Sequence, residues 1–381
     1  MNDTMHMPPV IDVRGTATPT FAEIEDVFAS SAARQGGGAM ALCIFEGGEK
    51  VLDLVSGSAE TDSLFQVFSV SKAITAIALA YAAQRRLIDL DTPIAQVVPA
   101  LDRPETDMIT ARMVLSHTSG ISAVAQPLTL EELIGPRFEQ SVTQADPLWV
   151  PGTAQGYGAF TFGALLDAFL KGATGENIAT FVTRNIARPL GANFGLGVSG
   201  LRAKKVVPLE FAAPALRPRE VQAMTQGDMI MDGAMAPLMA NPPAFFANPD
   251  VIGAQWPAMS GVGTADGLAR IMAAAIGAVK DVQLLEAAAL VDMTTEQTNG
   301  WDRALLKHTR FGSGVELPHV HLPLFGPASF GHQGAGGSLV AADPDRGIAM
   351  AFLTNKPTPV LGASDQGNAI VAALRQHTET Q

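Results

Sequence analysis

The segment Ser69-Val70-Ser71-Lys72 opens an alanine-rich stretch that continues to Tyr81, and this stretch is the strongest local constraint on the fold. Alanine has the highest helix propensity, so the stretch predicts a helix that begins beside Ser69. Residues three apart share a helix face, which places the Lys72 amine next to the Ser69 hydroxyl. Burial can lower the pKa of a lysine until it accepts a serine proton, so the pair indicates a nucleophile beside its base. A capping serine beside a solvated lysine would look the same, and other motifs must decide.

Two later segments carry residues suited to the same chemistry. Tyr157, one of two tyrosines, lies in the Gly- and Pro-rich loop 151–159, directly before a helical run over 162–170. Loops held by a rigid scaffold often carry catalytic side chains. Near the C-terminus, the segment 330–338 reads Phe-Gly-His-Gln-Gly-Ala-Gly-Gly-Ser and opens a predicted β-hairpin. Its glycines allow a ligand to approach the backbone closely, and the segment is therefore a candidate source of an oxyanion donor.

The order Ser-x-x-Lys, then Tyr, then His-x-Gly resembles the serine β-lactamase and penicillin-binding-protein superfamily, whose third motif is Lys-Thr-Gly or His-x-Gly. The resemblance covers about residues 20 to 375 and is strongest to the esterases related to class C β-lactamases, called family VIII carboxylesterases. Further phrases between the motifs support it: Leu64-Phe65-Gln66-Val67-Phe68, Leu87-Ile88-Asp89-Leu90-Asp91, Leu115-Ser116-His117-Thr118-Ser119-Gly120, Pro151-Gly152-Thr153 and Asp343-Pro344.

This resemblance implies a role for each motif residue. Ser69 would be the acyl-accepting nucleophile, Lys72 its base, and Tyr157 the relay that brings a proton to the leaving group. The oxyanion hole would consist of the backbone N–H groups of Ser69 and Ala335. First-turn N–H groups have no acceptor within the helix, and the helix dipole favours negative charge there, so the position of Ser69 suits this role.

The third motif departs from the lactamase pattern. His332, two residues before Gly334, would take the place of the lysine of Lys-Thr-Gly and would orient the hydrogen bonds around Tyr157. The lactamase Tyr-x-Asn is here Tyr157-Gly158-Ala159, so an amide donor is absent. A site that loses polar donors discriminates against substrates that need them. Both changes favour esters over penicillins or peptides.

The resemblance also implies an α/β (α+β) fold, with an antiparallel β-sheet flanked by helices and a mainly helical inserted domain, as in β-lactamases and transpeptidases. We expect an N-terminal extension over 1–19, a discontinuous α/β domain over 20–90 and 300–381, and a helical domain over 91–299. The sequence pattern is consistent with this division. It predicts helices over 20–34, 161–171, 177–187, 265–279, 284–294 and 366–376, and strands over 39–45, 50–55 and parts of 312–353.

Composition limits the classes of function. The chain has 381 residues and a net charge of −12, which disfavours binding to nucleic acids and anionic membranes. No apolar run reaches the roughly 18 residues of a membrane helix, and the N-terminus lacks a signal-peptide pattern. Cys43 is the single cysteine, so no internal disulfide can form, and we expect it in the core. These features predict a cytoplasmic protein, whose oligomeric state stays open. A serine hydrolase of the kind that the resemblance implies needs no metal or organic cofactor, so we expect none.

Three short patterns suggest other functions and are weaker. The segment 195–200 fits Gly-x-Gly-x-x-Gly, but no convincing βαβ unit follows it, which argues against dinucleotide binding. His319 and His321 would share one strand face as zinc ligands, yet no third ligand is evident. His117 could serve a Ser-His-Asp triad, but the chain has no Gly-x-Ser-x-Gly elbow. We interpret the phrase around His117 as a structural turn beside the site.

We therefore predict a serine hydrolase that cleaves small carboxylic esters through an acyl-Ser69 intermediate. A transesterase or amidase, in which an alcohol or amine replaces water, would use the same residues, and so would a β-lactamase-like enzyme. A non-catalytic binding or scaffold protein is the alternative of another class. The predicted partner is a small ester or acyl substrate, which the sequence does not identify further.

Overall fold

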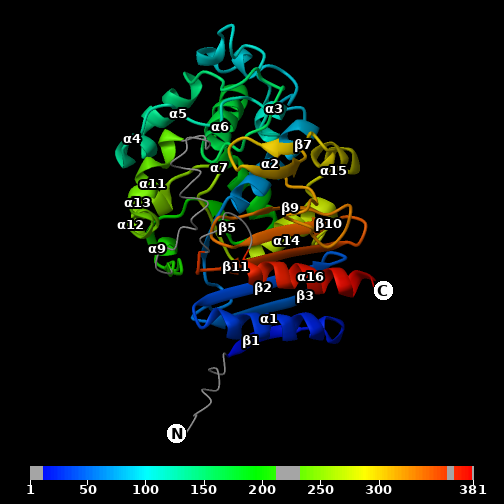
Figure 1. The fold of residues 1–381 in the computed structure, drawn as a ribbon. Coiled ribbons are helices and arrows are strands. Elements are labelled where there is room, and N and C mark those ends of the chain that lie inside the picture. The colour runs from blue at the N-terminus through cyan, green and yellow to red at the C-terminus, as the bar shows by residue number, and fades with distance from the viewer. Residues whose placement is uncertain (1–11, 212–231, 358–363, 380–381) are drawn as a thin grey trace.

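The computed structural model describes residues 12–211, 232–357 and 364–379. Within these residues, six strands form an antiparallel sheet in the order β1-β3-β2-β11-β10-β9 (Figure 1). Strand β2 pairs with β11, which comes from the other end of the chain, so the two ends build one sheet. The strands are β1 (Val13–Ala17), β2 (Ala39–Glu46), β3 (Glu49–Gly57), β9 (Phe330–Gln333), β10 (Leu339–Asp343) and β11 (Ile348–Thr354).

Alternate side chains of β2 enter two hydrophobic cores. Met40 and Ile44 lie in the core beneath α1 and α16, which pack against each other on one face of the sheet. Cys43 lies in the other core, on the face where α14 contacts β2, β10 and β11. Successive strand residues point to opposite faces, so a strand that is covered on both sides needs an unbroken apolar run. The helices are α1 (Ala22–Gln35), α14 (Ala265–Ile276) and α16 (Asp365–Glu379).

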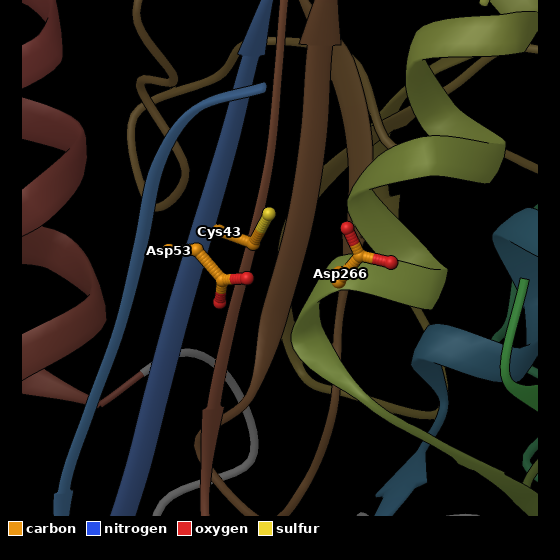
Figure 2. Close-up of side chains that lie close together, drawn as sticks. All are labelled: Cys43, Asp53 and Asp266. Atoms are coloured by element: carbon orange, nitrogen blue, oxygen red, sulfur yellow. The ribbon is translucent and has the colours of Figure 1, made fainter. Parts of the chain in front are cut away.

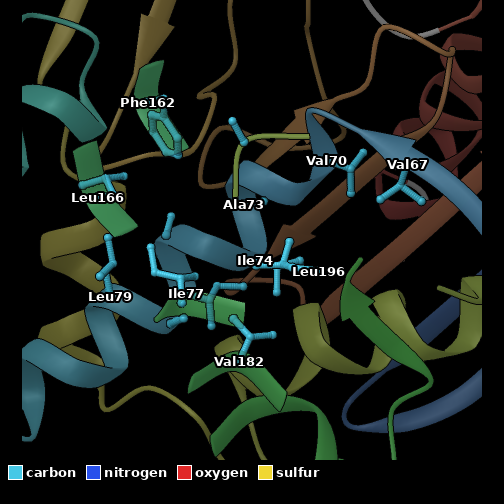
Figure 3. Packing of buried hydrophobic residues seen from close by; sticks show 14 of the residues in the cluster. Val67, Val70, Ala73, Ile74, Ile77, Leu79, Phe162, Leu166, Val182 and Leu196 are labelled. Atoms are coloured by element: carbon cyan, nitrogen blue, oxygen red, sulfur yellow. The ribbon is translucent and has the colours of Figure 1, made fainter. Parts of the chain in front are cut away.

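The helical part of the molecule is centred on α2 (Val70–Gln84), the helix that follows Ser69. Its apolar side chains pack against residues of α6, α7 and β5, as Figure 3 shows. Nearly every side chain from Val70 to Ala82 is buried, and alanine lets the neighbouring helices approach closely. The other helices are α3 (Ala111–Leu115), α4 (Leu130–Ile134), α5 (Pro136–Thr143), α6 (Thr161–Thr174), α7 (Ile178–Val182), α8 (Arg188–Leu190), α9 (Gly200–Ala203), α11 (Ala236–Ala240), α12 (Pro242–Ala247), α13 (Pro249–Gly253) and α15 (Ala287–Thr294).

Two small sheets connect the helical part to the large sheet in the described part of the chain. One has the order β4-β6-β5, and its strand β4 ends immediately before Ser69. The other is the β7–β8 hairpin, whose middle lies against the loop that carries Tyr157, because the Gln155 amide donates to Gly300 O and Thr309 Oγ1. The bounds are β4 (Phe65–Phe68), β5 (Phe194–Leu196), β6 (Gly261–Gly263), β7 (Thr298–Asp302) and β8 (Lys307–Phe311).

Cys43 lies beside two carboxylates, Asp53 on β3 and Asp266 on α14 (Figure 2). Both carboxylates already have cationic partners. Lys50 Nζ lies 2.6 Å from Asp53 Oδ2 and 3.3 Å from Asp266 Oδ1, and Arg270 donates to both Asp266 oxygens. Burial and then the two carboxylates raise the pKa of the Cys43 thiol, which keeps it protonated. The cluster therefore joins β2, β3 and α14 as a structural element, and Cys43 is buried as expected.

The structure confirms an α/β fold with a helix-flanked antiparallel sheet and a helical part. Residues 13–17 of the expected N-terminal extension form the edge strand β1, and α14 of the expected helical domain packs on the sheet. Residues 1–11 lie outside the described residues. The hairpin of β7 and β8 begins earlier than the expected strands, whereas 312–329 is mostly irregular. None of the helices in the described ranges is long and apolar enough to cross a lipid bilayer.

Candidate active site

Ser69 lies on a sharp turn between a strand and a helix. Strand β4 ends at Phe68, whose φ of 51° falls in the left-handed region, and Ser69 follows with φ −67° and ψ −8°. A bulky residue is strained in that region, so the surrounding structure must hold it. Ser71 supplies part of this support, because its hydroxyl donates to Phe68 O and accepts the Gly261 N–H at 2.8 Å. The second serine of the motif thus stabilises the turn that presents the first.

Lys72 points back toward Ser69 from the first turn of α2. Its Nζ lies 3.3 Å from Ser69 Oγ and donates to the carbonyls of Ala159 and Ala258, each at 3.0 Å. The side chain is fully buried. Burial lowers the pKa of Lys72 to about 7, and the charge of Glu316 opposes that shift. Near neutral pH a large fraction of Lys72 is therefore the free amine, which can accept a proton.

The loop 151–159 brings Tyr157 to the same place. The Lys72 nitrogen lies 4.6 Å from the centre of the Tyr157 ring, and the Tyr157 hydroxyl is hydrogen-bonded to the Ser69 side chain. Asp302 on β7 holds the loop, because its Oδ1 accepts the Tyr157 backbone N–H at 3.1 Å. Burial raises the pKa of Tyr157, and the hydrogen bond to Ser69 offsets part of that effect. Tyr157 is therefore a protonated phenol at neutral pH.

His117 is a buried histidine that contacts the Tyr157 loop directly. Its φ is 59°, so it does form the structural turn expected from the sequence. Its Nδ1 accepts the Gly158 N–H at 3.2 Å, and its ring lies 4.6 Å from the Tyr157 ring. Burial, followed by the charges of Lys72 and His332, lowers the pKa of His117 well below its usual range. His117 is thus a neutral acceptor that helps to position the loop.

The glycine-rich turn after β9 packs against β4, the strand that leads to the candidate nucleophile. A Cβ atom at Gly334 would lie 2.5 Å from Val67 O, and one at Gly336 would lie 2.3 Å from a Phe68 ring carbon. Real Cβ atoms do not approach so closely, so glycine is what permits this contact. Ala335 lies between these two glycines, on the turn that packs against the end of β4, directly before Ser69.

His332 is buried and linked to a carboxylate that the sequence analysis did not identify. Its Nδ1 lies 2.7 Å from Gln333 O and 3.8 Å from Glu316 Oε2. The Gln333 N–H donates to the same Glu316 oxygen at 2.9 Å. Burial lowers the pKa of His332 although Glu316 opposes the shift, so His332 is neutral at pH 7. Its ring centre lies 6.1 Å from that of Tyr157, so the two rings lie near each other.

The structure thus gathers Ser69, Lys72, Tyr157 and His332 around one point from three distant segments. It adds Glu316 and Asp302, whose roles no local pattern indicates. Both carboxylates are buried. Asp302 accepts the N–H groups of its neighbours Ala304 and Leu305 as well as that of the distant Tyr157, and Glu316 accepts the Gln333 N–H. His319 and His321 lie at a turn rather than share a strand face, and their ring centres lie 6.0 Å apart. The segment 195–200 begins within β5, a strand of an antiparallel sheet, which does not support dinucleotide binding.

Comparison with known proteins agrees with the arrangement of these motifs. Residues 24–374 match the family described as Beta-lactamase. The chain belongs to the beta-lactamase family. Within it, the protein is 28% identical over 386 residues to "Esterase/beta-lactamase LipL" of Mycobacterium tuberculosis (strain ATCC 25618 / H37Rv), a match that covers 94% of this chain and 86% of that protein.

Solved structures resemble this member of the beta-lactamase family over nearly their full length. EstA from Arthrobacter nitroguajacolicus Rue61a is 26% identical, with a TM-score of 0.84 over 96% of this chain and 98% of EstA. A family VIII carboxylesterase has the same TM-score at 23% identity, covering 96% of this chain and 100% of its own, and shows the same fold. The expected β-lactamase-like fold is confirmed, and the protein is a hydrolase of this family.

Proposed function

We propose that the protein is a carboxylesterase that hydrolyses small neutral esters through an acyl-Ser69 intermediate. Ser69 Oγ attacks the ester carbonyl carbon while Lys72 takes the hydroxyl proton, and the carbonyl oxygen becomes an oxyanion. The N–H groups of Ser69 and Ala335 bind that oxyanion. The carbon–oxygen bond to the alcohol then breaks, and Tyr157 passes a proton to the departing alkoxide. Water attacks the acyl-serine by the reverse proton path and releases the acid and free Ser69.

The observation that carries this proposal is the buried Lys72 amine, 3.3 Å from Ser69 Oγ with a pKa of about 7. Two groups near Ser69 could act as the base, Lys72 or the phenolate of Tyr157. The raised pKa of Tyr157 makes its phenolate scarce at neutral pH, whereas the Lys72 amine is abundant. A general base works best when its pKa lies near the working pH, so Lys72 is the base and Tyr157 carries protons as a phenol.

The third motif supports neutral esters as the substrate class. A fixed cation at the position of His332 would attract the carboxylate of a β-lactam, but burial keeps this imidazole neutral. At Ala159, where lactamases carry an asparagine, the backbone carbonyl accepts from Lys72 and the methyl side chain offers no amide. The carboxylate or amide of a β-lactam or peptide substrate would therefore find no partner in this site. A neutral ester has no such group to satisfy.

Active-site labelling tests this proposal. A fluorophosphonate should form one adduct, fragmentation of the labelled peptide should place it on Ser69 and not on Ser71, and Ser69→Ala should abolish both labelling and turnover of p-nitrophenyl butyrate. Ser58→Ala, at an exposed serine, is the control and should behave like the wild type. An adduct at another residue, or turnover by Ser69→Ala, contradicts the mechanism. Faster acyl transfer to added 1-butanol than to water identifies a transesterase instead.

A further inference from the structure

The described part of the chain has a pocket of about 300 Å³ that is separate from the candidate active site around Ser69. It is bounded by α7, the turn that follows α7, strand β5 and α9, all of which are labelled in Figure 1 except the turn. None of its lining residues belongs to the candidate active site. Its volume is at the lower end of the range for small-molecule sites, and it is larger than a single phosphate group requires.

Arginine side chains dominate this pocket. Arg184, Arg188 and Arg202 line it together with the hydroxyls of Thr180 and Thr183, and none of the described lining residues is acidic. The chain as a whole carries 37 acidic and 25 basic residues, so a pocket lined by three arginines departs from the charge of the rest of the molecule. Guanidinium groups bind phosphate and carboxylate oxygens in pairs, which makes such a pocket suited to an anion.

The local backbone explains how the arginines come to share one pocket. Thr183–Ala187 forms a π-helical turn, closed by the Arg188 N–H on Thr183 O, and this wider turn keeps Arg184 and Arg188 on one side. Such turns often occur at functional sites. The opposite wall contains Gly197, whose φ is +72° and at which a Cβ would lie 2.5 Å from Ala254 O. The glycine pattern of 195–200 thus forms one wall of a basic pocket.

The partners of the arginines indicate the charge of the ligand. Arg184 is paired with Glu176, 2.6 Å from its carboxylate, and Arg202 donates to Asn193 Oδ1 at 2.8 Å. Arg188 has neither an ion pair nor a side-chain hydrogen bond to any described residue. Three guanidinium groups and one nearby carboxylate leave two net positive charges, which matches a phosphate dianion better than a carboxylate. We propose that this pocket binds a phosphate group, either free phosphate or a small phosphate monoester.

Calorimetric titration of the full chain at low salt, in a buffer free of phosphate and sulfate, tests this proposal. Inorganic phosphate and phenyl phosphate are the probes, and benzoate is the carboxylate comparison. We expect saturable binding of phenyl phosphate, at least about tenfold weaker binding of benzoate, and weaker binding of both phosphate probes as chloride rises. Phenyl phosphate that binds tenfold tighter than inorganic phosphate identifies a monoester ligand, whereas equal affinities identify free phosphate.

Variants assign the binding to this pocket. Arg188→Gln and Arg202→Gln should each weaken phenyl phosphate binding about tenfold or more, because each removes charged hydrogen bonds. Arg137→Gln, at an exposed arginine of α5, is the matched control and should stay within about twofold of wild type. Ser69→Ala should bind normally. The proposal fails if no probe binds below about 10 mM, if Arg137→Gln weakens binding as much as Arg188→Gln, or if a Ser69 adduct blocks it.

Discussion

The side-chain nitrogen of Lys72 lies 4.6 Å from the centre of the Tyr157 ring, so the two proposed proton carriers are in direct contact. Tyr157→Phe keeps the ring that Lys72 packs against and removes only the hydroxyl. We expect this change, and separately Lys72→Ala, to lower kcat for p-nitrophenyl butyrate by at least about 100-fold, because each removes a general acid or base. The double variant should lose far less than the product of the two effects, since the residues act as a unit.

Steady-state kinetics on the folded variants, with circular dichroism as the control for folding, measures these losses. Tyr81→Phe is the matched control, because Tyr81 is the other tyrosine and lies away from Ser69, near the C-terminal end of α2, beside Phe181. It should leave kcat within about twofold of wild type. Near-normal turnover by Tyr157→Phe would remove Tyr157 from the mechanism.

The pH dependence of kcat/KM should report the titration of Lys72. The base must be unprotonated, and burial lowers the pKa of Lys72 to about 7. Activity should therefore rise with pH through about 7 and level off above about 8. A profile of kcat/KM between pH 5 and 9, with a neutral ester, measures this rise, which is the acid limb of the profile. An activity that still rises steadily at pH 9, without levelling off, would show that Lys72 titrates as an ordinary lysine and is not the base.

Glu316→Gln should move that limb to lower pH. The negative charge of Glu316 raises the pKa of Lys72, so the neutral glutamine should let the pKa fall further. Glutamine can still accept the Gln333 N–H, which preserves the local structure. Glu296→Gln is the control, because Glu296 is a surface carboxylate paired with Arg310. An unchanged limb in Glu316→Gln would mean that the carboxylate does not act on Lys72.

The buried Lys72 should also lower the free energy of unfolding at low pH, where its amine is protonated. Its pKa in the folded state, about 7, lies below the value of about 10.4 in an unfolded chain. The folded state therefore binds fewer protons between these values, and the free energy of unfolding should rise with pH from about 7 to 10 through this group. Lys72→Met should be more stable than wild type below pH 7, with a gap that shrinks as pH rises. Urea unfolding at pH 6 and pH 9 tests this; a gap that does not depend on pH contradicts it.

Substrate selectivity should depend on His332. We expect kcat/KM for p-nitrophenyl butyrate to exceed that for nitrocefin by about 100-fold or more, because the site lacks two polar contacts that a lactam uses. His332→Lys should reduce this difference in kcat/KM, because it adds a cation that attracts the carboxylate of a lactam. Glu316 Oε2, which lies 3.8 Å from His332 Nδ1, can stabilise that cation. Both substrates are measured on one preparation of each variant. Equal or faster nitrocefin turnover by wild type would favour a β-lactamase.

The sequence motifs indicated Ser69, Lys72, Tyr157 and His332 as site residues, but no motif indicated Asp302 or Glu316. The spacing of Ser69 and Lys72 determines their contact, because three residues along a helix return to the same face. Asp302 binds the Tyr157 N–H from 145 positions away, and no sequence period encodes that distance. Glu316 lies in an irregular stretch of isolated bridges, in a region predicted as strands. Buried carboxylates of this kind depend on the final packing and leave no signal in the local pattern.

The fold shows the same division. The apolar run over 39–45 predicted the strand β2. The helix predicted over 265–279 ends earlier, at Ile276, because Gly277 follows it in an extended conformation. The pairing of residues 13–17 with β3 was not predicted, because this edge strand is short, polar at its centre and exposed. The roles assigned to Ser69, Lys72, Tyr157, His332 and Ala335, the limits of the domains and the cytoplasmic location stay predictions.

The pairing of β2 with β11 has a consequence for synthesis of the chain. During translation β1, β2 and β3 leave the ribosome first, and the β2 edge that β11 later occupies stays open. At synthesis rates of about 5–20 residues per second, the gap of 302 positions between Glu46 and Ile348 takes about 15–60 s. An uncovered apolar edge strand invites pairing with another chain throughout that interval. Solubility during expression should therefore depend on how fast the last strands arrive, and a truncation before β11 should aggregate rather than yield a smaller active enzyme.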